Sequence, residues 1–379
     1  MIYLDHNATT QPAPEVVTEM TGCLTQAWGN PSSVHAGGQL ARAAREAARR
    51  ALGSLIHAVP ENILFTSGAT EAANQLLLGP LFKPGNQPRH IITSAIEHPC
   101  VLEPARILET LGWRVTRVGV NAEGRVDPQE VEAAIRPDTA LISVMLVNND
   151  TGVIQPVQEI AASAHRHHVP VHTDAVQAVG RIPVDFETLG ADFLTLSAHK
   201  LYGPKGVGAL VAREKAMLVP LLFGGSQENA LRAGTENLPG ICGLGAAARL
   251  ALRDMAGDAA RIANLRDRLQ AGLLAAFPGA HINGGHAARV PNTLNITFPG
   301  IDAVTAVMNL DIAGIAAATT SACSTANRQP PYVLTAMGLP PEQALASLRF
   351  SLGRSTTEAE IDQTVETLAE LLPQLRAHE

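Results

Sequence analysis

The sequence predicts an α/β protein whose large domain is built on a mainly parallel sheet and whose smaller domain is α+β. Between residues 60 and 212, short β-branched runs alternate with helical patterns, which is typical of a parallel sheet covered by helices. Beyond this region the order changes to a long helical stretch, two separated strands and a final helix. A chain of 379 residues is long enough to form two hydrophobic cores.

The elements of the large domain follow from local patterns, taken in chain order. An alanine- and arginine-rich stretch over residues 40–52 predicts a helix, which we expect Gly53 to end. Seven short, mostly β-branched runs then predict strands at 63–66, 90–93, 114–118, 141–147, 169–173, 193–196 and 208–211. Helical patterns between these strands predict helices at 71–78, 101–111 and 157–167.

The C-terminal part of the chain predicts a second, smaller domain. Residues 246–277 form a long helical pattern with an expected break near Gly257. A strand, a helix, a loop of small polar residues, a strand and a final helix are then predicted, with the regular elements at 293–298, 303–310, 347–352 and 358–377. We therefore expect a large domain over residues 1–255 and a small domain over 256–379. The N-terminal segment, up to about residue 12, is expected to pack on the small domain.

Composition excludes several classes of function. A formal net charge of −7 gives no basic surface for nucleic acid or for an acidic membrane. The start of the chain has an acid at its fifth residue and lacks a basic, then apolar, leader, so we expect no signal peptide. No apolar run is long enough to span a bilayer. We expect a cytoplasmic protein.

The four cysteines suggest one reactive thiol. They form no C-x-x-C pair, which argues against a zinc site or a disulfide framework. Cys23, Cys100 and Cys242 are expected to be small buried hydrophobic residues. Cys323 lies among small polar residues, in Ser321-Ala322-Cys323-Ser324, so we expect it on an exposed, mobile loop where it can act as a nucleophile.

The central chemical feature is a lysine that follows a predicted strand. Lys200 stands in Ser197-Ala198-His199-Lys200, directly before a glycine-rich turn, and Asp174 ends the preceding predicted strand. A lone lysine in such a place is most often a surface residue. Together with a carboxylate, however, it suits the Schiff-base lysine and the acid that pairs with the pyridinium nitrogen of pyridoxal phosphate (PLP).

A phosphate site is predicted where a strand turns into a helix. The turn Ser67-Gly68-Ala69-Thr70 presents free backbone N–H groups and the Thr70 hydroxyl, although such turns are also common helix caps. Further donors are available on Ser197, His199 and Thr235. The sequence has neither G-x-G-x-x-G nor G-x-x-x-x-G-K-[ST], so dinucleotide or nucleoside triphosphate binding has no support.

Other polar residues complete the predicted site, each with a simpler alternative. His98 can stack on a cofactor ring and move protons, or it can merely cap a helix. Asn149 and Gln177 are neutral hydrogen-bonding residues suited to the phenolic oxygen of the cofactor. Arg349 lies inside a β-like run, where it requires a partner. A substrate carboxylate is a natural bidentate ligand, and a structural salt bridge is the alternative.

These motifs together resemble the cysteine desulfurase family, in the NifS-like branch of PLP enzymes with the fold type I (aspartate aminotransferase) architecture. The matching segments run from residue 3 to about 365 and include YLDHNATT, GNPSSVH, FTSGATEAAN, EHPCVLEP, NNDTGVIQP, HTDAVQAVGRIPVD, SAHKLYGPKGVGAL, RAGTEN, SACS and SLRFSLGRSTT. Two departures are visible, and we expect neither to affect a chemical role. Asp150 stands where the family usually has glutamate, and the 224–232 segment has Ser226 for a third glycine and lacks an arginine near Asn229.

The resemblance implies a role for each candidate residue. Lys200 would bind PLP covalently and Asp174 would face its ring nitrogen. Asn149 and Gln177 would approach the phenolic oxygen, and His98 would stack on the ring. Arg349, with Asn149, would bind the substrate, and Cys323 would accept sulfur. The phosphate would lie against the remaining cofactor-binding residues, namely Ala69, Thr70, Ser197, His199 and, from the other subunit, Thr235.

The resemblance also implies an activity. We expect a homodimeric enzyme that converts L-cysteine to L-alanine and holds the sulfur on Cys323 as a persulfide. It would deliver the sulfur to a protein acceptor, either an iron–sulfur scaffold or a thiolation enzyme. A selenocysteine lyase or another PLP-dependent β-eliminating lyase is the alternative, and a non-catalytic scaffold that holds PLP is a third. No resident metal is predicted, while transient ligation of an iron–sulfur cluster by Cys323 stays open.

Overall fold

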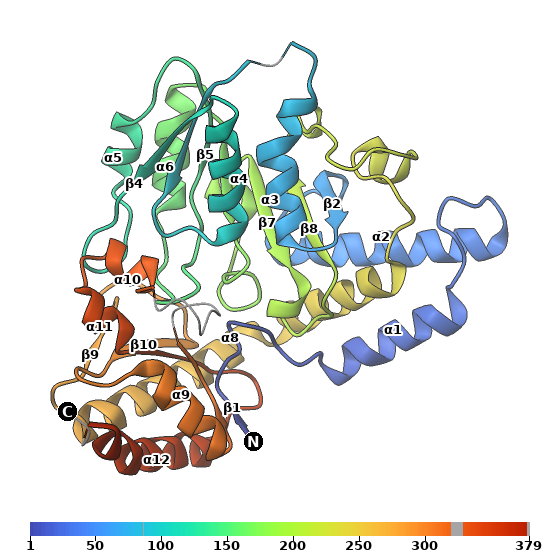
Figure 1. Ribbon diagram of the computed structural model, residues 1–379. Coiled ribbons are helices and arrows are strands. Elements are labelled where there is room, and N and C mark those ends of the chain that lie inside the picture. Colours follow the sequence, from blue (N-terminus) through green and yellow to red (C-terminus); the bar gives the residue numbers. More distant parts are fainter. Residues whose placement is uncertain (86, 320–328, 377–379) are drawn as a thin grey trace.

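The computed structural model describes residues 1–85, 87–319 and 329–376 (Figure 1). A seven-stranded sheet forms the centre of the large domain, in the order β2-β8-β7-β6-β5-β3-β4. Its strands are parallel except for β8, which runs antiparallel to β2 and β7. Their bounds are β2 Ile63–Thr66, β3 His90–Ser94, β4 Arg114–Val118, β5 Thr139–Ser143, β6 Val171–Asp174, β7 Phe193–Ser197 and β8 Gly208–Ala212. The predicted fold class is confirmed.

Helices cover both faces of this sheet. Neighbouring residues of a strand point to opposite faces, and in β2 Leu64 packs in a core with α3 and α4 whereas Phe65 packs in a core with α2 and α8. The helices α5 and α6 cover the far end of the sheet. The bounds are α1 Pro14–Gln26, α2 Ala36–Ile56, α3 Ala69–Leu78, α4 Pro99–Thr110, α5 Pro128–Ala133, α6 Val157–Arg166, α7 Phe186–Leu189 and α8 Leu238–Ala276.

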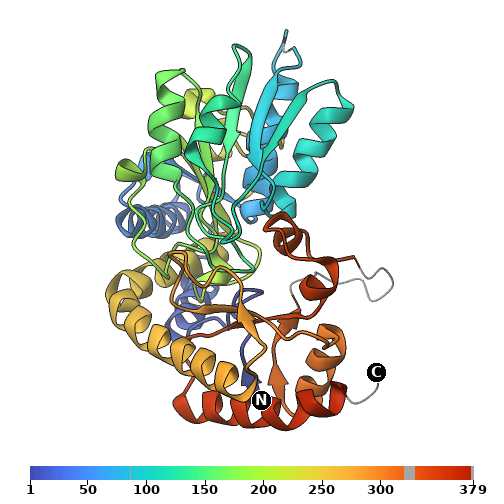
Figure 2. The ribbon, with the colours of Figure 1, turned by 90° about the vertical axis from the view of Figure 1, so that its left-hand side faces the viewer.

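The C-terminal part packs a second sheet against helices. Its four strands are antiparallel in the order β12-β13-β10-β9, and α8, α9 and α12 contribute to their core. The start of the chain lies beside this part (Figure 2), because β1 pairs in parallel with β11. The bounds are β1 Ile2–Tyr3, β9 His281–Ile282, β10 Thr293–Thr297, α9 Ala303–Ile312, β11 Ile315–Ala316, β12 Ala318–Thr319, α10 Tyr332–Ala336, α11 Pro341–Leu345, β13 Ser347–Ser351 and α12 Glu358–Arg376.

Three predicted boundaries are wrong. Gly53 does not end α2, which continues to Ile56 and stops where His57 adopts a left-handed conformation. The helix α8 is continuous over 39 residues and passes through Gly257 without a break, because packing at both ends outweighs the cost of one glycine, about 1 kcal/mol. The strand predicted over 141–147 ends at Ser143. The expected division near residue 255 falls within α8, and the domain boundary stays a prediction.

Candidate active site

A cavity of about 620 Å³ lies beyond the carboxyl ends of the parallel strands. Its walls come from the segments that follow β2, β3, β6 and β7, which meet at one edge of the sheet because these strands run in the same direction. The cavity brings together nine of the predicted site residues, Ala69, Thr70, His98, Asn149, Asp174, Gln177, Ser197, His199 and Lys200.

Lys200 lies at the end of a single helical turn, Ala198–Lys200, that follows β7. Its Nζ donates hydrogen bonds to the backbone oxygens of Asn7 at 2.5 Å and Ala8 at 2.7 Å. Burial lowers the pKa of Lys200 to about 8, and the positive charges of Arg181 and Arg349 act in the same direction. The amine can therefore lose its proton close to neutral pH, as a nucleophile or a general base requires.

Asp174 ends β6 and is 5% exposed. One carboxylate oxygen accepts a hydrogen bond from the Val176 amide at 2.9 Å, and the other lies 3.6 Å from the thiol of Cys100. Burial raises the pKa of Asp174, while the positive charges of His98 and Lys200 oppose this rise. Neither of its two hydrogen-bond donors is charged, so a cationic nitrogen placed against this carboxylate would stabilise its ionised form.

His98 both caps a helix and faces the cavity. Its Nδ1 accepts a hydrogen bond from the Cys100 amide at 3.1 Å at the start of α4. In this arrangement the proton of the neutral ring is on Nε2. Desolvation lowers the pKa of His98, and Lys200 adds to this effect. His98 thus caps the start of α4, as the alternative interpretation expects, but its Nε2 remains available to a ligand in the cavity.

The phosphate end of the predicted site is formed where β2 passes into α3. Ala69 begins α3, and its amide donates to the hydroxyl of Ser197 at 3.3 Å. A Cβ atom on Gly208 would lie 2.7 Å from the Cα of Gly68, so glycine is required for this close approach of two backbones. The hydroxyl of Thr70 is exposed at the first turn of the helix. These donors suit an anionic group.

The neutral amides of the site differ in how far they are already engaged. The Oδ1 of Asn149 is buried and has no hydrogen-bond partner among the described residues. Gln177 is engaged at both ends, since its Nε2 donates to the Asn7 oxygen at 3.1 Å and its Oε1 accepts from Arg181. Of the two, Asn149 is therefore the one that presents a polar atom in need of a ligand.

The donor set fits PLP. The helix start with its glycine cradle suits the phosphate, the weakly compensated Asp174 suits a ring nitrogen, and Asn149 brings an Oδ1 without a partner among the described residues to the cavity wall. Lys200 supplies an amine of lowered pKa for covalent attachment. PLP belongs to the size class of ligands that pockets of roughly 300–1,000 Å³ enclose.

Two predicted residues, Arg349 and Thr235, do not line the cavity, and a third cannot be placed. Arg349, on β13, is not a lone guanidinium, because it pairs with Asp5 at 2.9 Å and with Asp150 at 3.1 Å. The alternative of a structural salt bridge is thus observed. Thr235 is exposed and lies outside the cavity wall. Cys323 lies outside the described residues, and its placement in the site stays a prediction.

Several residues of the site escape prediction from the sequence. Asn7, Ala8 and Thr9 contact Lys200 or His199, although the YLDHNATT segment carries no predicted chemical role. The expectation that Asp150 has no chemical role is too simple, because it pairs with Arg349. Arg181 is not predicted either, and its one signal is a basic residue in the otherwise uncharged stretch between Asp174 and Asp185.

The remaining cysteines match their expected role. Cys23, Cys100 and Cys242 are free and buried, which confirms the prediction for these three. In the part of the chain that the structure describes, no helix combines the length and the apolar character needed to cross a membrane.

Comparison with known proteins identifies the family. The model of the aminotransferase class-V family matches residues 2–364. The cysteine desulfurase IscS of Dictyoglomus turgidum is 43% identical over 375 residues, which cover 99% of this chain and 95% of that protein. A cysteine desulfurase of Trichormus azollae is 45% identical over 378 residues, or 100% and 94% of the two chains. The solved structure of a NifS-like protein matches with a TM-score of 0.92 at 37% identity and covers 99% of this chain and 100% of its own. The chain therefore belongs to the aminotransferase class-V family and, within it, to the PLP-dependent cysteine desulfurases.

Proposed function

We propose that the cavity performs the desulfuration of L-cysteine with Lys200 as the residue that binds PLP and moves the proton. The observation that carries this proposal is the convergence of Lys200, Asp174 and His98 on one cavity. PLP bound there would supply an electron sink for negative charge at the substrate Cα. The protein would supply the placement of the groups and the proton transfers.

Each side chain has a proposed task. The Lys200 amine takes the proton from the substrate Cα and returns a proton later, which its lowered pKa favours. Asp174 would keep the ring nitrogen of PLP protonated, and His98 would contact the ring. Asn149 and Gln177 would bind the phenolic oxygen. The α3 amides would hold the phosphate together with Thr70, Ser197 and His199.

Arg349 binds the substrate carboxylate in this proposal, and Cys323 accepts the sulfur. The Cys323 thiolate attacks the sulfur of the substrate, so that an S–S bond forms while the C–S bond breaks. L-cysteine and the enzyme thiol become L-alanine and an enzyme persulfide, which balances all atoms and electrons. A protein thiol or an assembling iron–sulfur cluster then receives the sulfur. The relative named IscS supports iron–sulfur cluster assembly as the destination.

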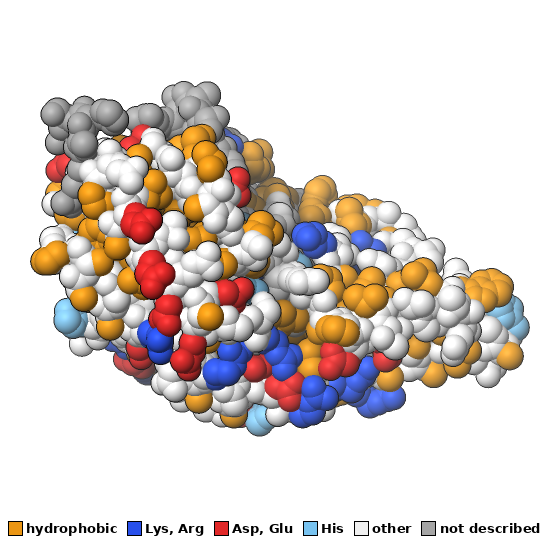
Figure 3. Space-filling view, turned by 90° about the horizontal axis from the view of Figure 1, so that it is seen from below, with side chains coloured by type: hydrophobic (Ala, Val, Ile, Leu, Met, Phe, Trp, Pro, Cys, Tyr) orange, Lys and Arg blue, Asp and Glu red, His pale blue; other side chains and the backbone are white. Residues whose placement is uncertain are grey.

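We also propose a cytoplasmic homodimer. Figure 3 shows hydrophobic side chains along the arm that α1 and α2 project from the body of the molecule, and five large ones are exposed on these helices and the loop between them: Val17, Leu24, Trp28, Val34 and Leu40. A surface of this kind favours burial against a second copy of the chain. Thr235 would then reach the phosphate site of the partner.

The experiment that tests the function compares Cys323→Ser with the wild type. The variant should keep the PLP absorbance but form almost no alanine, because a hydroxyl is a poor nucleophile toward sulfur. In the wild type, mass spectrometry after addition of cysteine should find about 32 Da of extra sulfur on the peptide that contains Cys323.

Cys242→Ala provides the control, since this thiol is buried and lies outside the cavity wall. Alanine formation should continue in this control. Normal turnover in Cys323→Ser, or sulfur trapped on Cys100 instead, would refute the assignment of the acceptor.

A further inference from the structure

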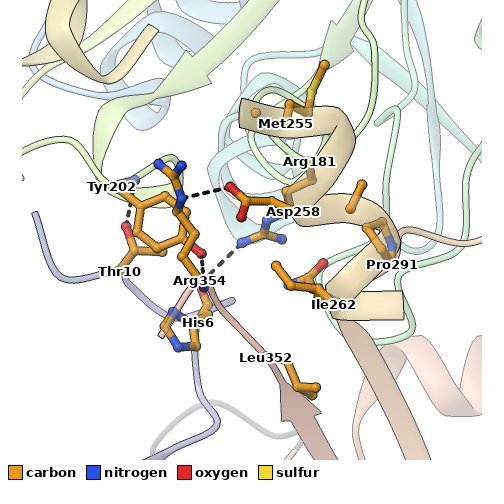
Figure 4. A pocket seen from close by; sticks show the side chains of 13 residues that line it. His6, Thr10, Arg181, Tyr202, Met255, Asp258, Ile262, Pro291, Leu352 and Arg354 are labelled. Atoms are coloured by element: carbon orange, nitrogen blue, oxygen red, sulfur yellow. Dashed lines mark hydrogen bonds and ion pairs between the residues drawn. The ribbon is translucent and has the colours of Figure 1, made fainter. Parts of the chain in front are cut away.

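A small cavity of about 30 Å³ lies next to the active site, between the N-terminal segment, α8 and β13 (Figure 4). Arg181 lines it together with Asp258 and Arg354, and Figure 4 shows these three side chains close to one another. Asp258, the acid in this group, forms an ion pair with Arg354 at 2.7 Å. Arg181 is therefore a half-buried cation beside an acid that serves another arginine.

The contacts of Arg181 are all with neutral oxygen atoms. Its guanidinium donates to the side-chain oxygen of Asn7 at 2.9 Å, to the backbone oxygen of His6 at 3.2 Å and to Oε1 of Gln177. Among the described residues it forms no ion pair with a carboxylate within 4.0 Å. Burial lowers the pKa of Arg181 to about 10, which still leaves it charged at neutral pH.

Asn7 connects this cation to the catalytic amine. Its side-chain oxygen accepts from Arg181, and its backbone oxygen accepts from Lys200 at 2.5 Å and from Gln177 at 3.1 Å. Asn7 itself is 2% exposed and is anchored by Asn292, Thr293 and Ser351. Two cations are thus held on one rigid residue, with no carboxylate between them in this hydrogen-bond network.

We infer that Arg181 is a positioning residue for Lys200: its guanidinium fixes Asn7 and Gln177, and its uncompensated charge favours the neutral form of the lysine amine. The inference rests on the proposed role of Lys200 as the reactive amine. It adds a specific reason for that reactivity, since a neutral amine is the nucleophilic and basic form.

The other charges near Lys200 compensate one another more fully. Arg349 also opposes the protonated amine, but it is paired with Asp5 and Asp150. Asp5 and Asp174 favour the protonated amine, and the titratable rings of His98 and His199 also face this region. Arg181 is the cation of this set without an acidic partner among the described residues, so its removal should change the proton affinity of Lys200 most directly.

The test measures the protonation of each lysine in the full-length protein freed of bound cofactor. The chain has only four lysines, Lys83, Lys200, Lys205 and Lys215, so competitive acetylation with acetic anhydride over a pH series can be read for each by mass spectrometry. Arg181→Gln keeps amide donors but removes the charge, and it should raise the pH of half-maximal Lys200 labelling by about one unit. Arg181→Lys keeps the charge and should leave this midpoint near that of the wild type. Lys83 serves as the internal reference.

A second variant keeps the test decisive if Arg181→Gln fails to fold. Gln177→Glu is nearly isosteric and places a carboxylate against Arg181, so it should raise the Lys200 midpoint as well. An unchanged midpoint in either folded variant would overturn the inference. An equal shift in Arg181→Lys and Arg181→Gln would also overturn it, since charge would then have no role. The measurement needs neither PLP nor cysteine, so an inactive enzyme with the expected midpoints would contradict the proposed function alone.

Discussion

The two sides of the active site differ in how their polar groups are compensated. On the cofactor wall, Lys200 contacts two backbone oxygens, Asp174 has an amide and a thiol as donors, and Asn149 has a buried oxygen without a partner among the described residues. Arg349, at the edge of this wall, is instead held by Asp5 and Asp150. The polar groups of the wall can gain hydrogen bonds from a ligand, whereas the charge of Arg349 is already compensated by two carboxylates.

One site can therefore combine polar groups that lack partners with a charged group whose charge is already compensated. Groups on the wall remain partly unsatisfied, so a bound cofactor can gain interactions that the protein alone does not make. If Arg349 binds the substrate carboxylate as proposed, that carboxylate would have to compete with two existing acids, which would weaken binding but exclude ligands without a strong anionic group. Changes in the wall should therefore affect function alone, and changes at Arg349 should affect function and stability together.

The largest expected effect is that of Lys200→Ala. Alanine formation from L-cysteine should fall by at least about 10³-fold, because the variant would lose both the proposed covalent ligand of the cofactor and the proposed proton carrier. The free energy of unfolding should be unchanged or higher, since the replacement removes a desolvated amine and the Asn7 oxygen keeps its hydrogen bond from Gln177. Lys83→Ala, far from the cavity wall, is the matched control and should keep full activity. A strong loss of stability in Lys200→Ala would contradict the expectation that changes in the cavity wall affect function alone.

Arg349→Ala should produce the next largest effect and a different pattern. KM for cysteine should rise by about 30- to 1,000-fold as a charged bidentate contact is lost, and Arg349→Lys should restore only part of the affinity. The free energy of unfolding should fall by about 3 kcal/mol, because Asp5 and Asp150 lose their partner. Urea unfolding alongside the kinetics checks both parts. A raised KM with unchanged stability would show that the two acids contribute little to the fold.

Glu97 tests whether buried polar groups without a hydrogen-bond partner also occur behind the cavity wall. It is buried, its Oε1 accepts from Ser94 and from the Met145 amide, and its Oε2 has no partner among the described residues. Burial raises the pKa of Glu97 to about 8 from its usual 4.5. The folded state thus binds this proton more tightly than the unfolded chain, so its stabilisation is complete below pH 4.5 and is lost as the pH rises through about 8.

Glu97→Gln imitates the protonated acid and should flatten this dependence. Between pH 5 and pH 8 the unfolding free energy of the variant should decline less than that of the wild type, by about 3.5 kcal/mol. Urea titrations at the two pH values measure the difference. If both proteins show the same decline, Glu97 does not take up a proton on folding.

The smallest effect should come from Thr235→Ala, which tests whether a second chain contributes a residue to the phosphate site. Loss of one hydroxyl contact to the phosphate should lower PLP affinity by about 3- to 10-fold, without a change in unfolding. PLP titration followed by absorbance measures the affinity, and sedimentation establishes whether the protein is a dimer. A fully active monomer at micromolar concentration would contradict both the dimer and this role of Thr235.

Local sequence patterns are sufficient to predict the fold class and most residues of the cavity wall. Strand and helix periods are local signals, and polar residues that follow parallel strands must meet at one edge of the sheet. For this reason the chain order alone predicts that Lys200, Asp174, His98 and the Ser67–Thr70 turn lie together. The combination of Lys200 and Asp174 already suggests PLP as the cofactor, and the resemblance to cysteine desulfurases adds the reaction.

Tertiary structure decides how charges are compensated and where helices end. The partners of Arg349 are Asp5 and Asp150, which are 344 and 199 positions away in the chain, and no local pattern pairs them. The lack of an acid for Arg181 among the described residues likewise depends on Asp258 being taken by Arg354. Packing at both ends carries α8 through Gly257, because contacts between distant segments outweigh a propensity difference of about 1 kcal/mol. Charge neutralisation and close packing are sums over neighbours in space, and only the folded chain defines those neighbours.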